Sequence, residues 1–359
     1  MRKIESFGFL VHPLTIEDVA KKYKIANKAP KLAARVLKRR PPFVLSEIEG
    51  LESETGARAR GWFVAVPLLP WQILDADDAY AIKKIVKAVK VAHKEGAGLV
   101  GLGAFTALVG GGGRAVAEEA EIPVTTGNTY TVVTAIDGIR EATRLMGTDL
   151  NTATLAVVGA SGSIGRVCAQ ILAGEVKEVR LIGRDAGRLE EAAKIVGGGN
   201  TTPVRTFTDV QKGIAEADIV ISVSSAADAL IQPNDIKTGA VVCDVARPRD
   251  VSARVVEVRD DVMVIDGGVV SAPGNVRQNF DLGMPDGLVE ACIAETMILA
   301  LEGRYESYTL GRDISLEKVQ EMEGLARKHG FKLAGLRRFE RALTPDEIDR
   351  IKQTAFAKS

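Results

Sequence analysis

The residue pattern with the clearest chemistry is a glycine-rich turn at residues 159–165, Gly-Ala-Ser-Gly-Ser-Ile-Gly. The apolar run Leu155–Val158 precedes it, and apolar side chains at helical spacing follow it. A buried strand, a glycine turn and a helix start together form an anion site, because glycine lets the backbone approach a phosphate and free N–H groups point toward it. We therefore predict a dinucleotide-binding turn with the ligand-contacting residues Gly159, Ser161, Gly162, Ser163, Ile164 and Gly165.

Two arginines follow the next predicted strand, Val179–Gly183. Arg184 comes directly after that strand, and Arg188 lies one helical turn further on. In such folds this position lies beside the adenosine ribose, where guanidinium groups suit a 2′-phosphate. Asp185 leaves an alternative open, because it could bind the ribose 2′-hydroxyl, although it also fits the N-cap of a helix at Ala186–Val196. The arrangement favours NADP(H).

The chain has three cysteines, Cys168, Cys243 and Cys292, and they form neither a disulfide framework nor a CxxC site. Cys168 and Cys243 occupy apolar positions of a predicted helix and strand, so both are expected in the core. Cys292 falls in a helix predicted from Pro285 to Leu301, where spacing alone usually indicates a small core residue. The alternative is a thiol that attacks an acyl group. With only three histidines, a His/Cys metal centre is not expected.

Alternating strands and helices must position these residues. Residues 151–270 contain six predicted strands, the number in a doubly wound nucleotide-binding sheet. Ser222, Val223 and Ser224, followed by Ser225, come after the fourth strand and should line the cofactor crevice, because ligands bind beyond the carboxyl ends of such strands. The expected fold class is α/β, with a doubly wound Rossmann-type parallel sheet, an N-terminal α/β substrate domain and C-terminal helices. The predicted boundaries are 1–150, 151–275 and 276–359.

The composition limits where the protein is expected in the cell and which partners it is expected to bind. The 359 residues carry a formal net charge of zero, so nothing draws the whole chain to nucleic acid or to an anionic membrane. No signal-like apolar core follows the N-terminus, and we expect a cytoplasmic protein without stable membrane insertion. The uncharged window Gly96–Gly113 approaches the length of a membrane span, but its glycines favour a buried strand and a loop. Residues 31–40 predict a basic amphipathic helix, either a solvated face or a docking patch for an acidic partner.

Several segments, in their order and at their separations, resemble the long-chain acyl-[acyl-carrier-protein] reductases best known from cyanobacteria. The segments are Gly101–Thr106, Thr125–Thr129, Val157–Gly165, Asp266–Val270 and Ala291–Met297. The sequence TTGNT together with ACxAExM is far more specific than the glycine turn alone. The resemblance covers nearly the whole chain. It implies reduction of a fatty acyl thioester, on acyl-carrier-protein or CoA, to a fatty aldehyde with NADPH.

In that family the cysteine at the position of Cys292 is the nucleophile. The resemblance implies that the Cys292 thiolate attacks the thioester, releases the carrier and holds an acyl-enzyme, which hydride from NADPH converts to the aldehyde. Thr106, Thr126, Asn128 and Ser225 are candidates for the substrate or nicotinamide side. Cys292 is predicted to return across the carboxyl edge of the nucleotide-binding sheet. A downstream aldehyde-consuming enzyme and a second copy of the chain are candidate partners.

This chain also departs from the family pattern. Tyr130 stands where the family has histidine, which puts a proton-transfer role there in doubt. Residues Ser271–Met284 and Gly110–Gly113 differ, and residues after Arg337 extend beyond the pattern. The acyl chain length therefore stays open. The alternatives are a shikimate-dehydrogenase-like or glutamyl-tRNA-reductase-like NADP oxidoreductase, and a non-catalytic NADP-binding regulator.

Overall fold

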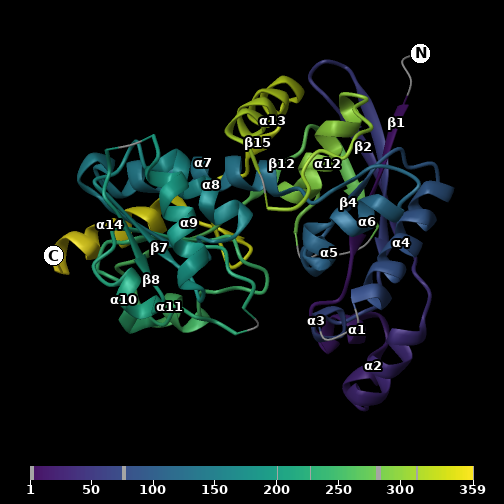
Figure 1. Cartoon of the computed structure of the whole chain (residues 1–359), viewed down its shortest axis with the longest axis horizontal. Helices are drawn as coiled ribbons and strands as arrows, with labels where there is room; N and C mark the ends of the chain where they lie inside the picture. The colour runs from purple at the N-terminus through teal and green to yellow at the C-terminus, as the bar shows by residue number, and fades with distance from the viewer. Residues whose placement is uncertain are drawn as a thin grey trace. The chain divides into compact units, whose positions relative to one another are not determined.

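The computed structural model describes residues 4–74, 78–199, 201–226, 228–279, 284–312 and 314–358. The chain forms two compact units, each made from separate stretches of sequence (Figure 1). Unit 1 comprises Met1–Asn128, Ser271–Asp313 and Met322–Lys332, and unit 2 comprises Thr129–Val270, Ile314–Glu321 and Leu333–Ser359. These units interleave along the chain, whereas the boundaries predicted at 150 and 275 divide it linearly, and those boundaries stay a prediction.

Unit 2 is built on a six-stranded parallel sheet of order β11-β10-β9-β6-β7-β8. Its central strands are short and apolar. Every residue of β9, β10 and β11 is buried, as expected of parallel strands covered on both faces. The order runs outward in both directions from the first strand, which is the doubly wound topology. The predicted α/β class and Rossmann-type sheet are therefore confirmed. The strands are β6 (Thr154–Val158), β7 (Glu178–Ile182), β8 (Val204–Phe207), β9 (Ile219–Ser222), β10 (Val241–Asp244) and β11 (Met263–Asp266).

Helices and a terminal hairpin complete unit 2. The helices are α7 (Asn128–Met146), α8 (Ser163–Leu172), α9 (Ala186–Gly197), α10 (Val210–Ile214), α11 (Ala253–Val258) and α14 (Pro345–Lys358), and the hairpin strands are β16 (Arg337–Arg338) and β17 (Arg341–Ala342). Thr344 and Glu347 cap α14 reciprocally in a capping box. Cys168 in α8 and Cys243 in β10 are fully buried, which confirms both as core residues. Burial raises the pKa of the Cys168 thiol to about 12.

Unit 1 contains a mixed sheet of order β13-β2-β3-β1-β4-β5. Strands β2 and β3 form an antiparallel hairpin, and β1 pairs in parallel with β3 and β4. Strand β13 pairs antiparallel with β2 although more than 200 residues separate them in the chain, a contact that local sequence does not signal. The strands are β1 (Ile4–Val11), β2 (Phe43–Glu52), β3 (Arg58–Ala65), β4 (Val100–Leu102), β5 (Val124–Thr125) and β13 (Gly274–Gln278).

Two helices cover opposite faces of the unit 1 sheet. A methyl group added at Gly8 would lie 2.7 Å from Ala92 in α4 (Asp78–Lys94), and one added at Gly101 would lie 2.2 Å from the Thr296 hydroxyl in α12 (Ala291–Leu301). Because Gly101 pairs with Phe9 rather than with Gly8, the two glycines point to different faces. The sheet thus approaches both helices closely.

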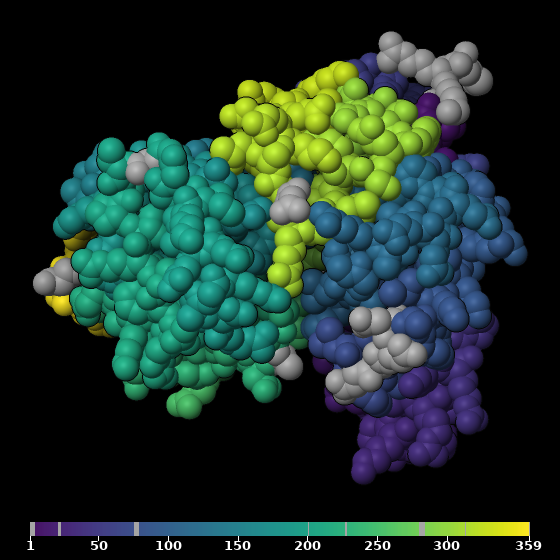
Figure 2. Space-filling view, in the orientation of Figure 1, coloured from purple at the N-terminus to yellow at the C-terminus, as the bar shows by residue number. Residues whose placement is uncertain are grey.

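Shorter helices surround this core. They are α1 (Ile16–Lys22), α2 (Pro30–Arg39), α3 (Pro70–Leu74), α5 (Val109–Gly112) and α6 (Arg114–Glu119), with 3₁₀ turns η1 (Lys24–Asn27) and η2 (Ala104–Ala107). Helix α2, in purple, forms one end of unit 1 (Figures 1 and 2). The window Gly96–Gly113 holds the buried strand β4 and a glycine-rich loop segment, as predicted. Among the described residues, none of the helices combines the length and the apolar character needed to cross a membrane.

The predicted helix start at Pro285 is wrong. Leu288 N–H donates to the Pro285 carbonyl at 3.1 Å, and Gly287 has φ +79°, so these residues form a tight turn. A short strand, β14 (Leu288–Glu290), follows before α12 begins at Ala291. Proline and aspartate open helices and turns alike, and here the glycine decides for the turn. The correction moves Cys292 from the middle of a helix to its first turn.

Candidate functional site

Cys292 is the second residue of α12 and the exception to that helix's burial. Every other residue of α12 is buried, whereas Cys292 is half-buried. The helix is buried on all sides, is apolar apart from Glu295 and Thr296, and packs on β1 and β4, which is typical of a central helix. Cys292 is therefore the one residue of α12 that keeps part of its surface exposed.

Two opposing effects act on the Cys292 thiol. Burial, and then the charge of Glu290, raises its pKa well above the usual range, while the main-chain N–H groups of Ile293 and of Cys292 itself act in the opposite direction. Such N–H groups are available because the first turn of a helix lacks intrahelical acceptors for them. The Glu290 carboxylate lies 3.9 Å from Cys292 Sγ. The resting thiol is thus protonated, with a carboxylate acceptor beside it.

The sequence did not identify Glu290. On a continuous helix, residues two apart do not face each other. Glu290 instead has extended backbone, with φ −69° and ψ 147°, at the N-cap of α12, and this turns its side chain toward Cys292. The Asp286-Gly287 pair was the signal available in the sequence, because it marks a turn that ends before Cys292.

The TTGNT segment lies directly against Cys292. Gly127 has φ +75°, and a methyl group added there would lie 2.3 Å from Cys292 Cα and 2.4 Å from Cys292 Cβ. Only glycine permits so close an approach. The two segments that carry the most specific part of the resemblance, more than 160 residues apart in the chain, are therefore neighbours in unit 1.

A buried carboxylate joins these segments. Glu295, one turn after Cys292, has no exposed surface and accepts hydrogen bonds from the hydroxyls of Thr125 at 2.6 Å and Thr309 at 2.9 Å. Thr309 N–H in turn donates to Thr125 Oγ1 at 3.1 Å. Burial of a carboxylate is costly unless hydroxyls or cations satisfy it. Glu295 accordingly fixes the strand before Gly127 to the helix of Cys292.

The remaining substrate-side candidates differ in what their side chains do. The hydroxyls of Thr106 and Thr126 are buried and donate to main-chain carbonyls at 2.7 Å and 3.2 Å. Asn128 is half-buried and follows Gly127 at the start of α7. Ser225 is exposed and belongs to unit 2. Tyr130 is buried, and burial followed by the charge of Asp137 raises its pKa beyond the usual range. The catalytic roles of these residues stay predictions.

The glycine turn of unit 2 has the geometry of a phosphate cradle. Gly159 has φ +82°, and a Cβ there would lie 2.6 Å from the Val223 carbonyl oxygen. A Cβ at Gly165 would lie 2.7 Å from the Gly159 oxygen. Gly162 is the N-cap of α8, so Ser163, Ile164 and Gly165 form its first turn, with Ser161 before it. Side chains at these glycines would fill the cradle, and the residues therefore fit a dinucleotide pyrophosphate.

The acidic residue after β7 is a helix cap. Asp185 Oδ1 accepts the Arg188 N–H at 3.0 Å, and Asp185 Oδ2 lies 3.6 Å from Arg188 Nε. The predicted N-cap role of Asp185 is confirmed. Arg184 and Arg188 are both exposed at this end of the sheet. Arg184 and Arg188 supply two positive charges here, and the Asp185 carboxylate is already engaged as the helix cap. This arrangement suits a 2′-phosphate better than a ribose 2′-hydroxyl.

The loop after β9 is held by a residue that the sequence did not single out. Ser222 Oγ donates to Asp250 at 2.7 Å, and Ser224 donates through N–H at 2.8 Å and through Oγ at 2.6 Å. Ser222 and Asp250 are fully buried. Asp250 thereby fixes the loop that includes Val223, whose carbonyl contacts Gly159. Contact of Ser222, Val223 and Ser224 with the cofactor stays a prediction.

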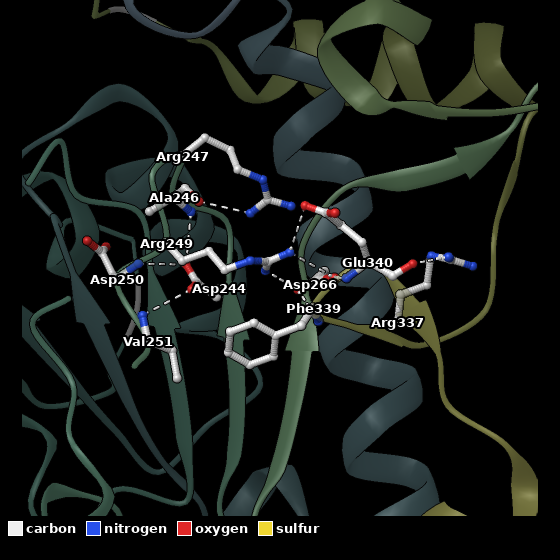
Figure 3. A network of polar contacts seen from close by, with 10 residues as sticks. All are labelled: Asp244, Ala246, Arg247, Arg249, Asp250, Val251, Asp266, Arg337, Phe339 and Glu340. Carbon is white, nitrogen blue, oxygen red and sulfur yellow. Dashed lines mark hydrogen bonds and ion pairs between the residues drawn. The ribbon is translucent and has the colours of Figure 1, made fainter. Parts of the chain in front are cut away.

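Two further buried aspartates organise the carboxyl edge of the sheet (Figure 3). Asp244, at the end of β10, accepts main-chain N–H groups from the following loop, and burial raises its pKa to about 6. Asp266, at the end of β11, pairs with Arg249 and accepts the N–H groups of Phe339 at 3.1 Å and Glu340 at 2.7 Å. The terminal hairpin is therefore anchored on a residue of the DGGVV segment.

A serine, a histidine and a glutamate in unit 1 form a chain that could be mistaken for a hydrolytic site. Ser53 Oγ lies 2.7 Å from His329 Nδ1, and His329 Nε2 lies 2.6 Å from Glu302 Oε1. Ser53 and His329 are buried, and Ser53 Oγ also accepts the Thr55 N–H at 3.0 Å. A nucleophile must reach its substrate, so this chain ties the β2–β3 hairpin to α13 (Leu316–His329) instead.

Comparison with known proteins places the nucleotide-binding part among oxidoreductases. The family described as Shikimate / quinate 5-dehydrogenase matches residues 140–266, which is less than half of the chain. A glutamyl-tRNA reductase from Psychrobacter cryohalolentis is 28% identical over 187 residues, 49% of this chain and 39% of that protein. Together with the parallel sheet and its glycine cradle, these matches support an NADP-dependent oxidoreductase.

Two longer matches cover most of this chain. The aminotransferase PigE from a Serratia species is 31% identical over 339 residues, 90% of this chain, and this chain spans only 39% of that relative's length. A long-chain acyl-[acyl-carrier-protein] reductase from Synechococcus elongatus is 28% identical over 307 residues, 81% of this chain and 87% of the relative. The similarity to the reductase thus extends over 81% of this chain and agrees with an NADP-binding oxidoreductase.

Proposed function

We propose that this protein reduces an acyl thioester, carried by acyl-carrier-protein or CoA, to an aldehyde with NADPH, and that Cys292 is the nucleophile. The observation that carries the proposal is the placement of Cys292 as the one partly exposed residue of a buried helix, with Gly127 of the TTGNT segment against it. A cysteine that only filled the core would need neither an exposed surface nor a glycine packed against its main chain. The reductase named in Synechococcus elongatus supports the same chemistry.

The first step transfers the acyl group to sulfur. Cys292 Sγ forms a bond to the acyl carbon, the bond from that carbon to the carrier sulfur breaks, and the thiol proton passes by way of Glu290 to the leaving thiolate. Because the thiol pKa is well above that of a carboxyl group, transfer to Glu290 alone is uphill. The proton therefore moves as the new bond forms, which is general base catalysis. The first-turn N–H groups of α12 lie where charge develops.

The second step releases the aldehyde. Gly159, Ser161, Gly162, Ser163, Ile164 and Gly165 would hold the pyrophosphate of NADPH, and Arg184 with Arg188 its 2′-phosphate. When bound, NADPH supplies a hydride for the acyl carbon. Cys292 then leaves that carbon as a thiolate, and the thiol is restored by one proton from water. Overall one thioester, one NADPH and one proton give one aldehyde, one carrier thiol and one NADP⁺.

Acylation without NADPH tests the proposal. We expect a purified protein incubated with a long-chain acyl-CoA to gain the mass of one acyl group on Cys292 and on neither Cys168 nor Cys243, which are buried. Glu290→Gln should slow this acylation about 10²-fold, the usual contribution of a general base. The same variant should speed alkylation by iodoacetamide at pH 8, because the charge that raises the thiol pKa is gone. Absence of the adduct at every chain length, with aldehyde still formed by Cys292→Ala, contradicts the proposal.

The match of residues 140–266 to the shikimate and quinate dehydrogenase family favours one other candidate, oxidation of a small hydroxy acid with NADP⁺. That reaction needs no thiol. Cys292→Ala would keep full activity if this candidate were correct, and would abolish aldehyde formation if the proposed function is correct.

A further inference from the structure

One surface of unit 1 concentrates positive charge in a chain whose formal net charge is zero. Residues 19–46 contain nine lysines and arginines and no aspartate or glutamate. This stretch includes η1 and α2, at one end of unit 1 (Figure 2). In a chain of zero net charge, randomly placed acidic residues would neutralise most such clusters of lysine and arginine. The unneutralised cluster therefore indicates an anionic binding partner.

Helix α2 presents basic and apolar side chains on the same outward face. Its inner face carries the buried Ala34, whereas Lys31, Leu32, Arg35 and Val36 are all exposed. Leu32 and Val36 each keep 60% of their surface open although they lie one turn apart on the same side. A solvated face would not place two large apolar side chains side by side between cations.

Helix α4 extends this surface. The Tyr80 hydroxyl donates to the Lys38 carbonyl at 2.8 Å, which joins the start of α4 to the end of α2. Lys83 and Lys87 follow on exposed positions of α4. Burial, then the charges of Lys38 and Lys87, lowers the pKa of Lys84 to about 8. Burial of Lys84, together with the positive charges of Lys38 and Lys87, thus disfavours a proton on this amine.

We propose that this α2–α4 surface, the outward faces of both helices, docks an acidic helix of the carrier protein that presents the acyl thioester. The proposal rests on the proposed function. On α2, within residues 19–46 that hold no acidic residue, exposed apolar side chains lie among charges of one sign. This is the composition of a protein interface with an apolar centre and a charged rim that steers the partner. A membrane-surface helix instead separates a wide apolar face from its polar face. The inner face of α2 is small and covered, with Ala34 buried at its centre, so the observations favour the acidic protein.

Charge reversal tests the surface. The double variant K31E/R35E should lower kcat/KM about tenfold for an acyl group on carrier protein, through KM, and should remove most of its dependence on salt. The same acyl group on N-acetylcysteamine, which has no charge, should be reduced at the wild-type rate. The matched control K177E/K194E reverses two exposed lysines of unit 2 and should leave both substrates unchanged.

Each outcome is decisive. An unchanged kcat/KM for carrier-bound substrate in K31E/R35E overturns the proposal, and so does an equal loss with the uncharged thioester. If the variant instead loses only sedimentation with phosphatidylglycerol vesicles, the surface binds lipid and the proposal is overturned. Anisotropy of labelled acyl-carrier-protein gives the docking constant without turnover. If neither thioester is reduced by the wild type but K31E/R35E weakens that binding tenfold, the proposed function fails and the docking surface stands.

Discussion

The contact between Gly127 and Cys292 makes a quantitative prediction for Gly127→Ala. The added methyl group would lie 2.3 Å from Cys292 Cα and 2.7 Å from the Cys292 carbonyl oxygen. Both atoms belong to the main chain at the start of α12, so no side-chain rotation relieves the overlap. The residue must also keep φ near +75°, which an L-amino acid rarely adopts.

The expected cost has two parts. The left-handed backbone costs about 1–2 kcal/mol for a residue with a Cβ. Overpacking in a rigid contact adds about 1–3 kcal/mol. The control Gly303→Ala isolates the first part, because Gly303 has φ +68° with nothing within 4 Å of an added methyl group. The free energy of unfolding of Gly127→Ala should therefore fall about 1–3 kcal/mol below that of the control.

Urea unfolding measures this difference, and acylation of Cys292 measures its effect on chemistry. A displacement of the nucleophile by about 1 Å costs about 10²-fold in rate, so Gly127→Ala should acylate about a hundred times more slowly. Gly303→Ala should acylate within about twofold of wild type, because its added methyl group contacts nothing and does not displace Cys292. Equal stability and equal acylation of the two variants would refute the reasoning.

Three further predictions concern unit 2. Arg184→Asp should shift the preference for NADPH over NADH by about tenfold or more, and an unchanged ratio of KM values would contradict the 2′-phosphate assignment. Asp266→Asn should destabilise the unit by about 3–5 kcal/mol in urea, because it breaks a buried ion pair. Asp260→Asn removes an exposed pair with Lys358 and should leave the unfolding midpoint in urea nearly unchanged. The pKa of the Cys168 thiol is raised to about 12 in the folded protein. Its contribution to the free energy of unfolding is therefore complete below about pH 8.5 and declines by about 1.4 kcal/mol per pH unit as pH rises toward 12. Urea titrations at pH 8 and 10 should show this loss in wild type and a smaller one in Cys168→Ala.

The nucleotide-binding sheet could be predicted because its signals are local. The central strands are short apolar runs, each glycine of the turn has a fixed role, and Asp185 caps the helix that its position in the sequence indicates. The order of the strands then follows from the doubly wound rule. Cys168 and Cys243 were equally predictable, because an apolar helix face and a buried strand leave a thiol no other place.

The candidate site could be predicted only in part, because its contacts are non-local. The contact of Gly127 with Cys292 joins positions that no periodicity relates. The nearness of Glu290 depends on where α12 begins, and proline and aspartate at 285–286 point to a helix start six residues too early. Asp250 lies in a loop, and no pattern in the neighbouring sequence indicates that Ser222 and Ser224, at the end of β9, donate hydrogen bonds to it.

The corrected start of α12 also bears on why the thiol is protonated at rest. A permanently ionised cysteine is exposed to oxidation in proportion to its thiolate fraction. Burial and Glu290 keep that fraction low, while first-turn N–H groups remain to stabilise charge once it forms. A carboxylate 3.9 Å away then supplies the acceptor that attack on a thioester needs. Under the proposed function, Glu290 therefore makes Cys292 selective as well as reactive. Replacing it with glutamine should gain reactivity toward a small alkylating agent and lose reactivity toward the thioester, two opposite changes that a purely structural residue would not produce.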